Sequence, residues 1–210
     1  IVLDTDSDSN VIGGTSPGAG NVISGNTQFG ISIRSVGSTD NEVLGNIIGL
    51  DATGITDVGN AGDGVTSDSA PNNTIGGSTP EAGNIISGNS GDGVSIVGVT
   101  ATGIQVSANT IQDNDQIGVF LDGVPNNWVG TDSDGVGDAA EGNVIDRNQH
   151  GVSIQGADAT ANVIAGNLIG LGGGNDDGVQ IIESDGNTIG GTTAAARNVI
   201  SSNITNAIQL

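Results

Sequence analysis

The chain has 210 residues and a formal net charge of −21, because 24 acidic residues face three arginines and no lysine. This charge makes nucleic acid and anionic membranes poor partners. The absence of cysteine excludes disulfides and thiolate-bound metals, and no apolar run approaches the roughly 20 residues of a membrane span.

A Gly-apolar-polar-apolar phrase recurs along the chain at intervals of 25 to 34 residues. A short strand unit that returns at this period, with inserts of variable length, is typical of a solenoid. In its last copy alanine replaces the glycine, and we expect the glycine to mark a turn. The seven copies are Gly30–Ile33, Gly64–Ser67, Gly93–Ile96, Gly118–Leu121, Gly151–Ile154, Gly178–Ile181 and Ala207–Leu210.

Two further strand phrases, most of them opened by asparagine, follow each copy except the last, as in Asn41–Val43 and Asn46–Ile48. A partial coil precedes the first copy. Three short strands per coil predict an all-β fold, a right-handed parallel β-helix with three sheets and about seven coils. We expect residues 1–210 to form a single domain that is a segment of a longer repeat array.

Two columns of asparagine are predicted, and their side chains are expected to hydrogen-bond from coil to coil. One column opens the third strand of each coil, and the other lies five residues further on. The first contains Asn21, Asn46, Asn84, Asn109, Asn143, Asn167 and Asn198, and the second contains Asn26, Asn89, Asn114, Asn148 and Asn203.

Five inserts interrupt the repeat, and we expect them to project from one edge of the rod, where solenoids commonly bind their ligands. Three of them share one short form. The five are Gly13–Gly20, Asp51–Asp63, Gly76–Gly83, Gly130–Gly142 and Gly190–Arg197.

The insert Gly130–Gly142 contains the candidate metal ligands Asp132, Asp134, Asp138 and Glu141. Calcium takes six to eight oxygen ligands from flexible loops, and alternating aspartates next to glycine supply such oxygens. The loop is therefore a candidate Ca²⁺ site, and a solvated acidic loop that binds no metal is the alternative interpretation.

The cadence of NTIGG, NIISGN and GDGVSI resembles the right-handed parallel β-helix repeats of large secreted bacterial surface proteins. Pectate lyases, polygalacturonases and alginate epimerases share that fold. The resemblance covers nearly the whole chain and implies a secreted or cell-surface location. It is a resemblance of fold and leaves the activity open.

If the chain is an enzyme, its candidate catalytic residues are His150, Asp177, Asp122 and Arg147. His150 is expected to stack about 4.8 Å from Asp177 in the next coil. The segment that starts at His150 is similar to the His-Gly segment of polygalacturonases, and Asn175–Gly178 is similar to their paired-aspartate segment. The Arg-x-Lys element of that family has no counterpart here, because the chain has no lysine.

Two aromatic residues, Trp128 and Phe120, occupy outward positions of predicted strands and are candidates for stacking on a sugar ring. The expected function is a non-catalytic structural, adhesive or surface-layer segment that stacks end to end on other copies or adjoining repeats. Two alternatives stay open: a calcium-assisted polysaccharide-active enzyme (hydrolase, lyase or epimerase) and a glycan-binding module.

Overall fold

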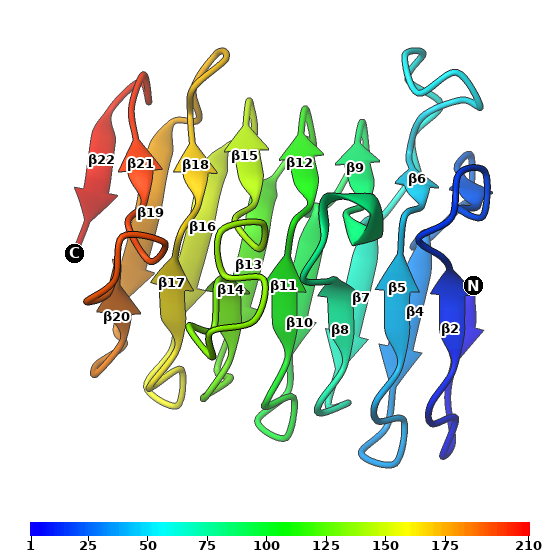
Figure 1. Ribbon diagram of the computed structural model, residues 1–210, viewed down its shortest axis with the longest axis horizontal. Helices are drawn as coiled ribbons and strands as arrows, with labels where there is room; N and C mark the ends of the chain where they lie inside the picture. The colour runs from blue at the N-terminus through cyan, green and yellow to red at the C-terminus, as the bar shows by residue number, and fades with distance from the viewer.

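Each repeated phrase forms a strand that pairs in parallel with the same phrase one coil later. The computed structural model describes residues 1–210 and arranges their strands in three parallel sheets (Figure 1). The chain therefore folds as the predicted right-handed, three-sheet β-helix. Sheet A consists of β1 (Val2–Leu3), β4 (Ile31–Arg34), β7 (Val65–Asp68), β10 (Val94–Val97), β13 (Ile117–Asp122), β16 (His150–Gln155), β19 (Asp177–Ile182) and β22 (Asn206–Gln209).

Sheets B and C contain seven strands each, and one short 3-10 helix, η1 (Pro80–Ala82), lies between them. Sheet B consists of β2 (Val11–Gly13), β5 (Glu42–Leu44), β8 (Thr74–Gly76), β11 (Gln105–Ser107), β14 (Trp128–Gly130), β17 (Val163–Ala165) and β20 (Thr188–Ile189). Sheet C consists of β3 (Val22–Ile23), β6 (Ile47–Ile48), β9 (Ile85–Ser87), β12 (Thr110–Gln112), β15 (Val144–Asp146), β18 (Leu168–Ile169) and β21 (Val199–Ile200).

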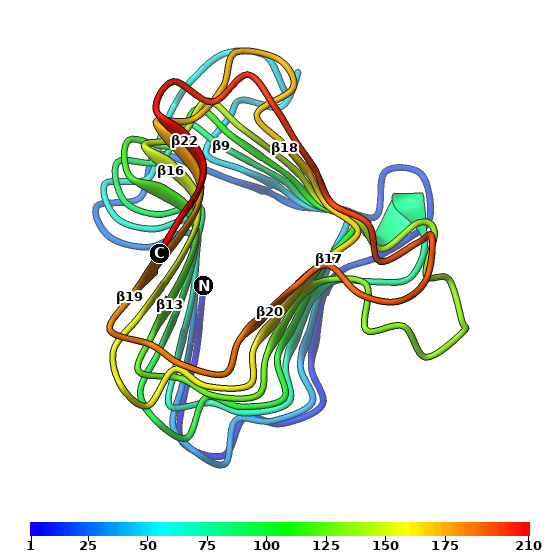
Figure 2. The same cartoon turned by 90° about the vertical axis from the view of Figure 1, so that its left-hand side faces the viewer.

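Viewed down the rod, the three sheets form the sides of a triangle, and the longer loops leave at its corners (Figure 2). The interior is a single cluster of 27 buried apolar residues, all of them Ile, Val, Leu or Ala. Small and β-branched side chains suit this narrow space, because each stacks on its equivalent in the next coil.

The repeated glycine of sheet A lies in a bend just before the strand in its first three copies, whereas in the next three it lies within the strand, so the prediction that it marks a turn is wrong for those three. Gly118 and Gly151 lie inside strands β13 and β16. A Cβ atom built on Gly93 would lie 2.4 Å from Cγ2 of Ile111 in sheet C. Glycine is needed here because the isoleucine column of sheet C packs directly against the backbone of sheet A.

Asparagine ladders run along all three corners of the rod. In each ladder the Oδ1 atom of one asparagine accepts hydrogen bonds from the backbone N–H and the Nδ2 of the asparagine in the preceding coil. Asn109, for example, accepts both from Asn84 at 3.0 and 2.9 Å, and donates both to Asn143. Its Nδ2 also donates to the carbonyl of Ile75. The ladder thus satisfies buried backbone groups where the strands end.

The two predicted asparagine columns are confirmed as ladders, and the structure extends them. Asn60 and Asn175 join the second column, where inserts displace them from the expected spacing. A third ladder, which the sequence analysis did not identify as one, opens the strands of sheet B. It is interrupted where Ile104 replaces asparagine, and it contains Asn10, Asn41, Asn73, Asn127, Asn162 and Asn187.

The ladder predicts a large difference between internal and terminal asparagines. Asn109→Ala should destabilise the fold by about 3 kcal/mol or more, because it removes the side chain's bonds to Asn84, Asn143 and the Ile75 carbonyl and leaves the backbone N–H of Asn84 buried without a partner. Asn21→Ala should cost less than about 1 kcal/mol, because Asn21 is exposed and its side chain makes one hydrogen bond. Urea unfolding of both variants measures the two losses. Equal losses would contradict a cooperative ladder.

Candidate functional site

Four of the five inserts project from the corner between sheets B and C, and Asp51–Asp63 does not. That insert connects β6 of sheet C to β7 of sheet A, so the expectation of a single edge is wrong for it. The B–C corner carries a groove of about 350 Å³ between the inserts Gly76–Gly83 and Gly130–Gly142, with sheet B as its floor.

Three carboxylates of the insert Gly130–Gly142 converge in this groove. Asp132, Asp134 and Glu141 each offer one oxygen, and these oxygens all lie within 4.8 Å of one another. They are therefore the residues that could hold a metal ion. Asp138, the fourth predicted ligand, is not part of this group, and its Oδ1 accepts a hydrogen bond from the backbone N–H of Gly135 at 3.0 Å.

The shape of the insert comes from short-range turns. Oδ1 of Asp132 accepts the N–H of Asp134 at 3.0 Å, and Oδ1 of Asp134 accepts the N–H of Val136 at 2.7 Å. Gly135 has a φ of 91°, in the left-handed region that favours glycine. Oδ1 of each of these aspartates thus holds the turn of the loop that brings the carboxylates together.

Glu141 differs from the two aspartates because it is buried, with only 2% of its surface exposed. Its Oε2 atom has no hydrogen-bond partner. Burial raises the pKa of its carboxyl above the ordinary value. The nearby charges of Asp132 and Asp138 add to the rise, and Thr131 partly offsets it. A buried carboxylate in acidic surroundings is unfavourable unless a cation or a proton neutralises it.

His150 and Asp177 are direct neighbours in sheet A, as predicted. They pair in register between β16 and β19, with 3.3 Å between Nδ1 of His150 and Oδ2 of Asp177. Oδ1 of Asp177 accepts hydrogen bonds from the Thr205 hydroxyl and from both the backbone and side chain of Asn206. The Thr205 hydroxyl is the main cause of the lowered pKa of Asp177, ahead of Asn206 and His150. The Asp177 carboxylate therefore connects its coil to the last coil by hydrogen bonds.

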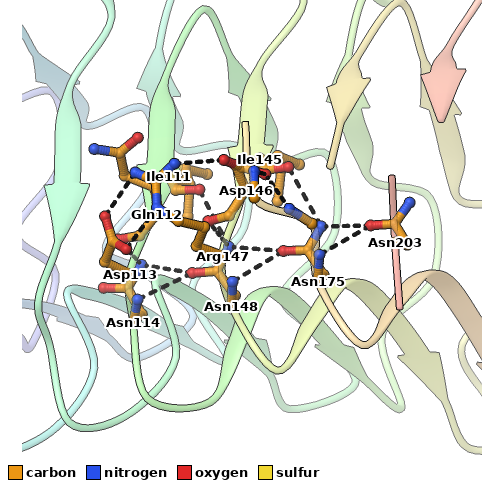
Figure 3. Close-up of polar contacts among 12 residues, drawn as sticks. Ile111, Gln112, Asp113, Asn114, Ile145, Asp146, Arg147, Asn148, Asn175 and Asn203 are labelled. Carbon is orange, nitrogen blue, oxygen red and sulfur yellow. Dashed lines mark hydrogen bonds and ion pairs between the residues drawn. The ribbon is translucent and has the colours of Figure 1, made fainter. Parts of the chain in front are cut away.

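Arg147 and Asp122 do not join the His150–Asp177 pair. Arg147 forms ion pairs with Asp113 at 2.7 Å and Asp146 at 2.5 Å, outside the asparagine ladder of the C–A corner (Figure 3). Asp122 pairs with Gln155 at the far end of β13, five residues from the row of His150, which is about 16 Å along the strand. The four predicted catalytic residues are thus not assembled around one point.

The two candidate aromatic residues lie on different sheets. Phe120 pairs with Ser95 and Ser153 in sheet A, whereas Trp128 pairs with Gln105 and Val163 in sheet B. Both side chains are half-buried. They therefore do not form a common aromatic surface.

Comparison of the chain with protein-family models, with curated proteins and with solved structures found no match. The chain is therefore classified by its fold alone, as a parallel β-helix. Among its helical segments, none has both the length and the apolar character required to cross a membrane.

Sequence reasoning missed the role of the acids that precede the glycines of sheet A. Oδ1 of Asp63 accepts the N–H of Asp92, and Oδ1 of Asp92 accepts the N–H of Ile117, both at 2.9 Å. Asp177 does the same for Asn206. These carboxylates continue the coil-to-coil bonding, so acids in this column have a structural role. The signal was the recurrence of Asp directly before Gly.

This role of Asp92 is electrostatically unfavourable, because it buries a carboxylate. Burial raises the pKa of Asp92 to about 6, and the nearby Asp63 adds to the rise. A raised carboxyl pKa means that folding stability is lost as the pH increases from about 4 to about 6. Asp92→Asn keeps the acceptor and removes the charge, so it should stabilise the protein by about 1 to 3 kcal/mol near pH 7.5 and by much less near pH 4.

Urea unfolding at both pH values tests this prediction. Asp158→Asn is the matched control, since it removes one exposed charge from the same acidic chain. Equal stabilisation by the two variants near neutral pH would show that overall charge, and not the burial of Asp92, is responsible.

Proposed function

We propose that this chain is a non-catalytic structural segment of a secreted or cell-surface protein. In this proposal it is a rigid rod whose end coils stack on further coils of the same kind. The observation that carries the proposal is the direction of the asparagine ladders. Every ladder runs parallel to the rod, with its donors facing one end and its acceptors facing the other.

At the N-terminal end, the Oδ1 atoms of Asn10, Asn21 and Asn26 receive no hydrogen bond from within the chain, whereas the equivalent atoms of the next coil, in Asn41, Asn46 and Asn60, each accept two. At the C-terminal end the backbone N–H groups of Asn187, Asn198 and Asn203 donate no hydrogen bond, whereas the same groups one coil earlier each donate to the following coil. The Nδ2 atom of Asn203 is buried and has no partner. A further coil at either end would supply these groups with partners of the kind that they have inside the rod.

The polarity selects one arrangement of two rods. Head-to-tail stacking brings the donors of Asn187, Asn198 and Asn203 to the acceptors of Asn10, Asn21 and Asn26. Head-to-head or tail-to-tail stacking would bring like groups together. A head-to-tail contact joins two different surfaces, so repetition of it produces a filament and not a closed dimer.

The unequal numbers of strands in the three sheets mean that two strands compete for one position in such a stack. Sheet A has eight strands and sheets B and C have seven, so β22 begins a coil that lacks its other two strands. In a head-to-tail stack the next two strands are β2 and β3 of the second copy. The first strand of that copy, β1, then competes with β22 for the same place beside β4. Two residues of β1 pair with β4, whereas β22 has four residues, so β22 is the longer competitor.

We therefore expect the chain to associate reversibly, and deletion of Ile1–Leu3 to strengthen association because it frees the edge of β4 for β22. Asn203→Asp should weaken association, since it places a carboxylate against an acceptor, while the Nδ2 that it removes makes no bond within the rod. Sedimentation velocity over a wide concentration range measures both effects. Physiological salt is needed because the net charge of −21 opposes association.

The control is Asn126→Asp, which makes the same chemical change in an exposed lateral turn. Circular dichroism confirms that each variant is folded. The proposal fails if the truncated chain stays monomeric at every concentration, or if Asn203→Asp and Asn126→Asp associate equally.

A further inference from the structure

The four inserts of the B–C corner alternate with short turns, so that every second coil carries one. The connections from β2 to β3, β8 to β9, β14 to β15 and β20 to β21 are long, whereas β5 to β6, β11 to β12 and β17 to β18 are joined by two residues. A long insert covers the short turn of the coil before it. The backbone carbonyls of Ala82, Glu141 and Ala196 accept the N–H groups of Gly45, Ala108 and Gly166, respectively.

These hydrogen bonds establish which residues of the inserts are equivalent. Glu141 occupies the place that Ala82 and Ala196 occupy in the sister inserts, and all three are almost fully buried. Thr131 occupies the place of Gly14 and Gly77, since each donates its N–H to a carbonyl of the following coil, from Ala165, Leu44 and Ser107, respectively.

In the sister inserts this place is filled by a small apolar pair. A Cβ atom on Gly77 would lie 2.9 Å from Cβ of Ala82, and one on Gly191 would lie 2.6 Å from Cβ of Ala196. Glycine and alanine thus close the corner tightly without any polar group. The fold therefore does not require the Thr131 and Glu141 pair, which needs a longer loop to make room for it.

The exchange of alanine for glutamate introduces a buried carboxylate with an unpartnered oxygen, next to two aspartates. Each of these features is unfavourable in the absence of a cation. We propose that the carboxylates of Asp132, Asp134 and Glu141 bind a divalent cation, calcium. The bound ion would close the insert Gly130–Gly142 onto the corner of the β-helix.

The donor set favours calcium among the divalent ions. All three side chains offer oxygen, and the loop contains no histidine or cysteine. Calcium binds at 2.3–2.6 Å from its ligand oxygens and tolerates irregular geometry, so oxygens within 4.8 Å of one another can share one ion. Magnesium demands a near-ideal octahedron and keeps several waters. The groove leaves room for water to complete the calcium shell.

The sister inserts suggest the decisive variant, because Glu141→Ala restores the residue that the corner has elsewhere. Isothermal titration with calcium chloride in physiological salt should show one saturable site in the wild type, with a dissociation constant of about 10⁻⁴ to 10⁻³ M. Glu141→Ala should weaken binding at least tenfold. Without calcium, its melting temperature should equal or exceed that of the wild type, because the buried charge is gone.

Glu81→Ala is the matched control, since it removes one exposed carboxylate from the sister insert Gly76–Gly83. It should bind calcium as the wild type does, and magnesium chloride should bind the wild type more weakly than calcium. Equal calcium affinity of Glu141→Ala and Glu81→Ala would overturn the proposal, as would the absence of a saturable site. A loss of melting temperature in calcium-free Glu141→Ala would instead assign Glu141 a packing role and contradict the inference.

Discussion

The need to satisfy backbone hydrogen-bonding groups at the three corners of each coil is the constraint on which this fold depends. Strands of two to six residues leave many N–H and carbonyl groups beyond the sheets. Asparagine meets this need because its amide carries both a donor and an acceptor, as the peptide group does. Stacked asparagines thus extend the hydrogen bonding of the sheets around the corners, and the narrow core is built almost entirely of isoleucine and valine.

The same constraint explains why acids recur on sheet A. Asp63, Asp92 and Asp177 accept backbone N–H groups of the following coil, and His150 lies beside Asp177 in this column. Their carboxylates are engaged in coil-to-coil bonding. The perturbed pKa of Asp92 has a structural origin, the burial of a carboxylate that the following coil needs as an acceptor.

The insert Gly130–Gly142 stands out against this regular background. Its sister inserts close the corner with glycine and alanine, whereas this insert buries a threonine and a glutamate at the same place. Comparison between repeats of one chain therefore separates what the fold requires from what one coil adds. The addition is three converging carboxylates beside a groove, a chemistry that the rest of the corner lacks.

The sequence by itself determined the fold class, the strand positions, two asparagine columns and the pairing of His150 with Asp177, because each follows from a period that a parallel solenoid converts directly into stacking. It also singled out the loop in which the carboxylates of Asp132, Asp134 and Glu141 converge. Only the tertiary structure decided that Gly118 packs against the core, that Asn60 and Asn175 belong to a ladder, and that Arg147 and Asp122 lie apart from His150. It also excluded Asp138 from the carboxylate cluster and showed Glu141 to be buried. These features depend on how inserts of unequal length fold over neighbouring coils, and periodicity carries no information about that.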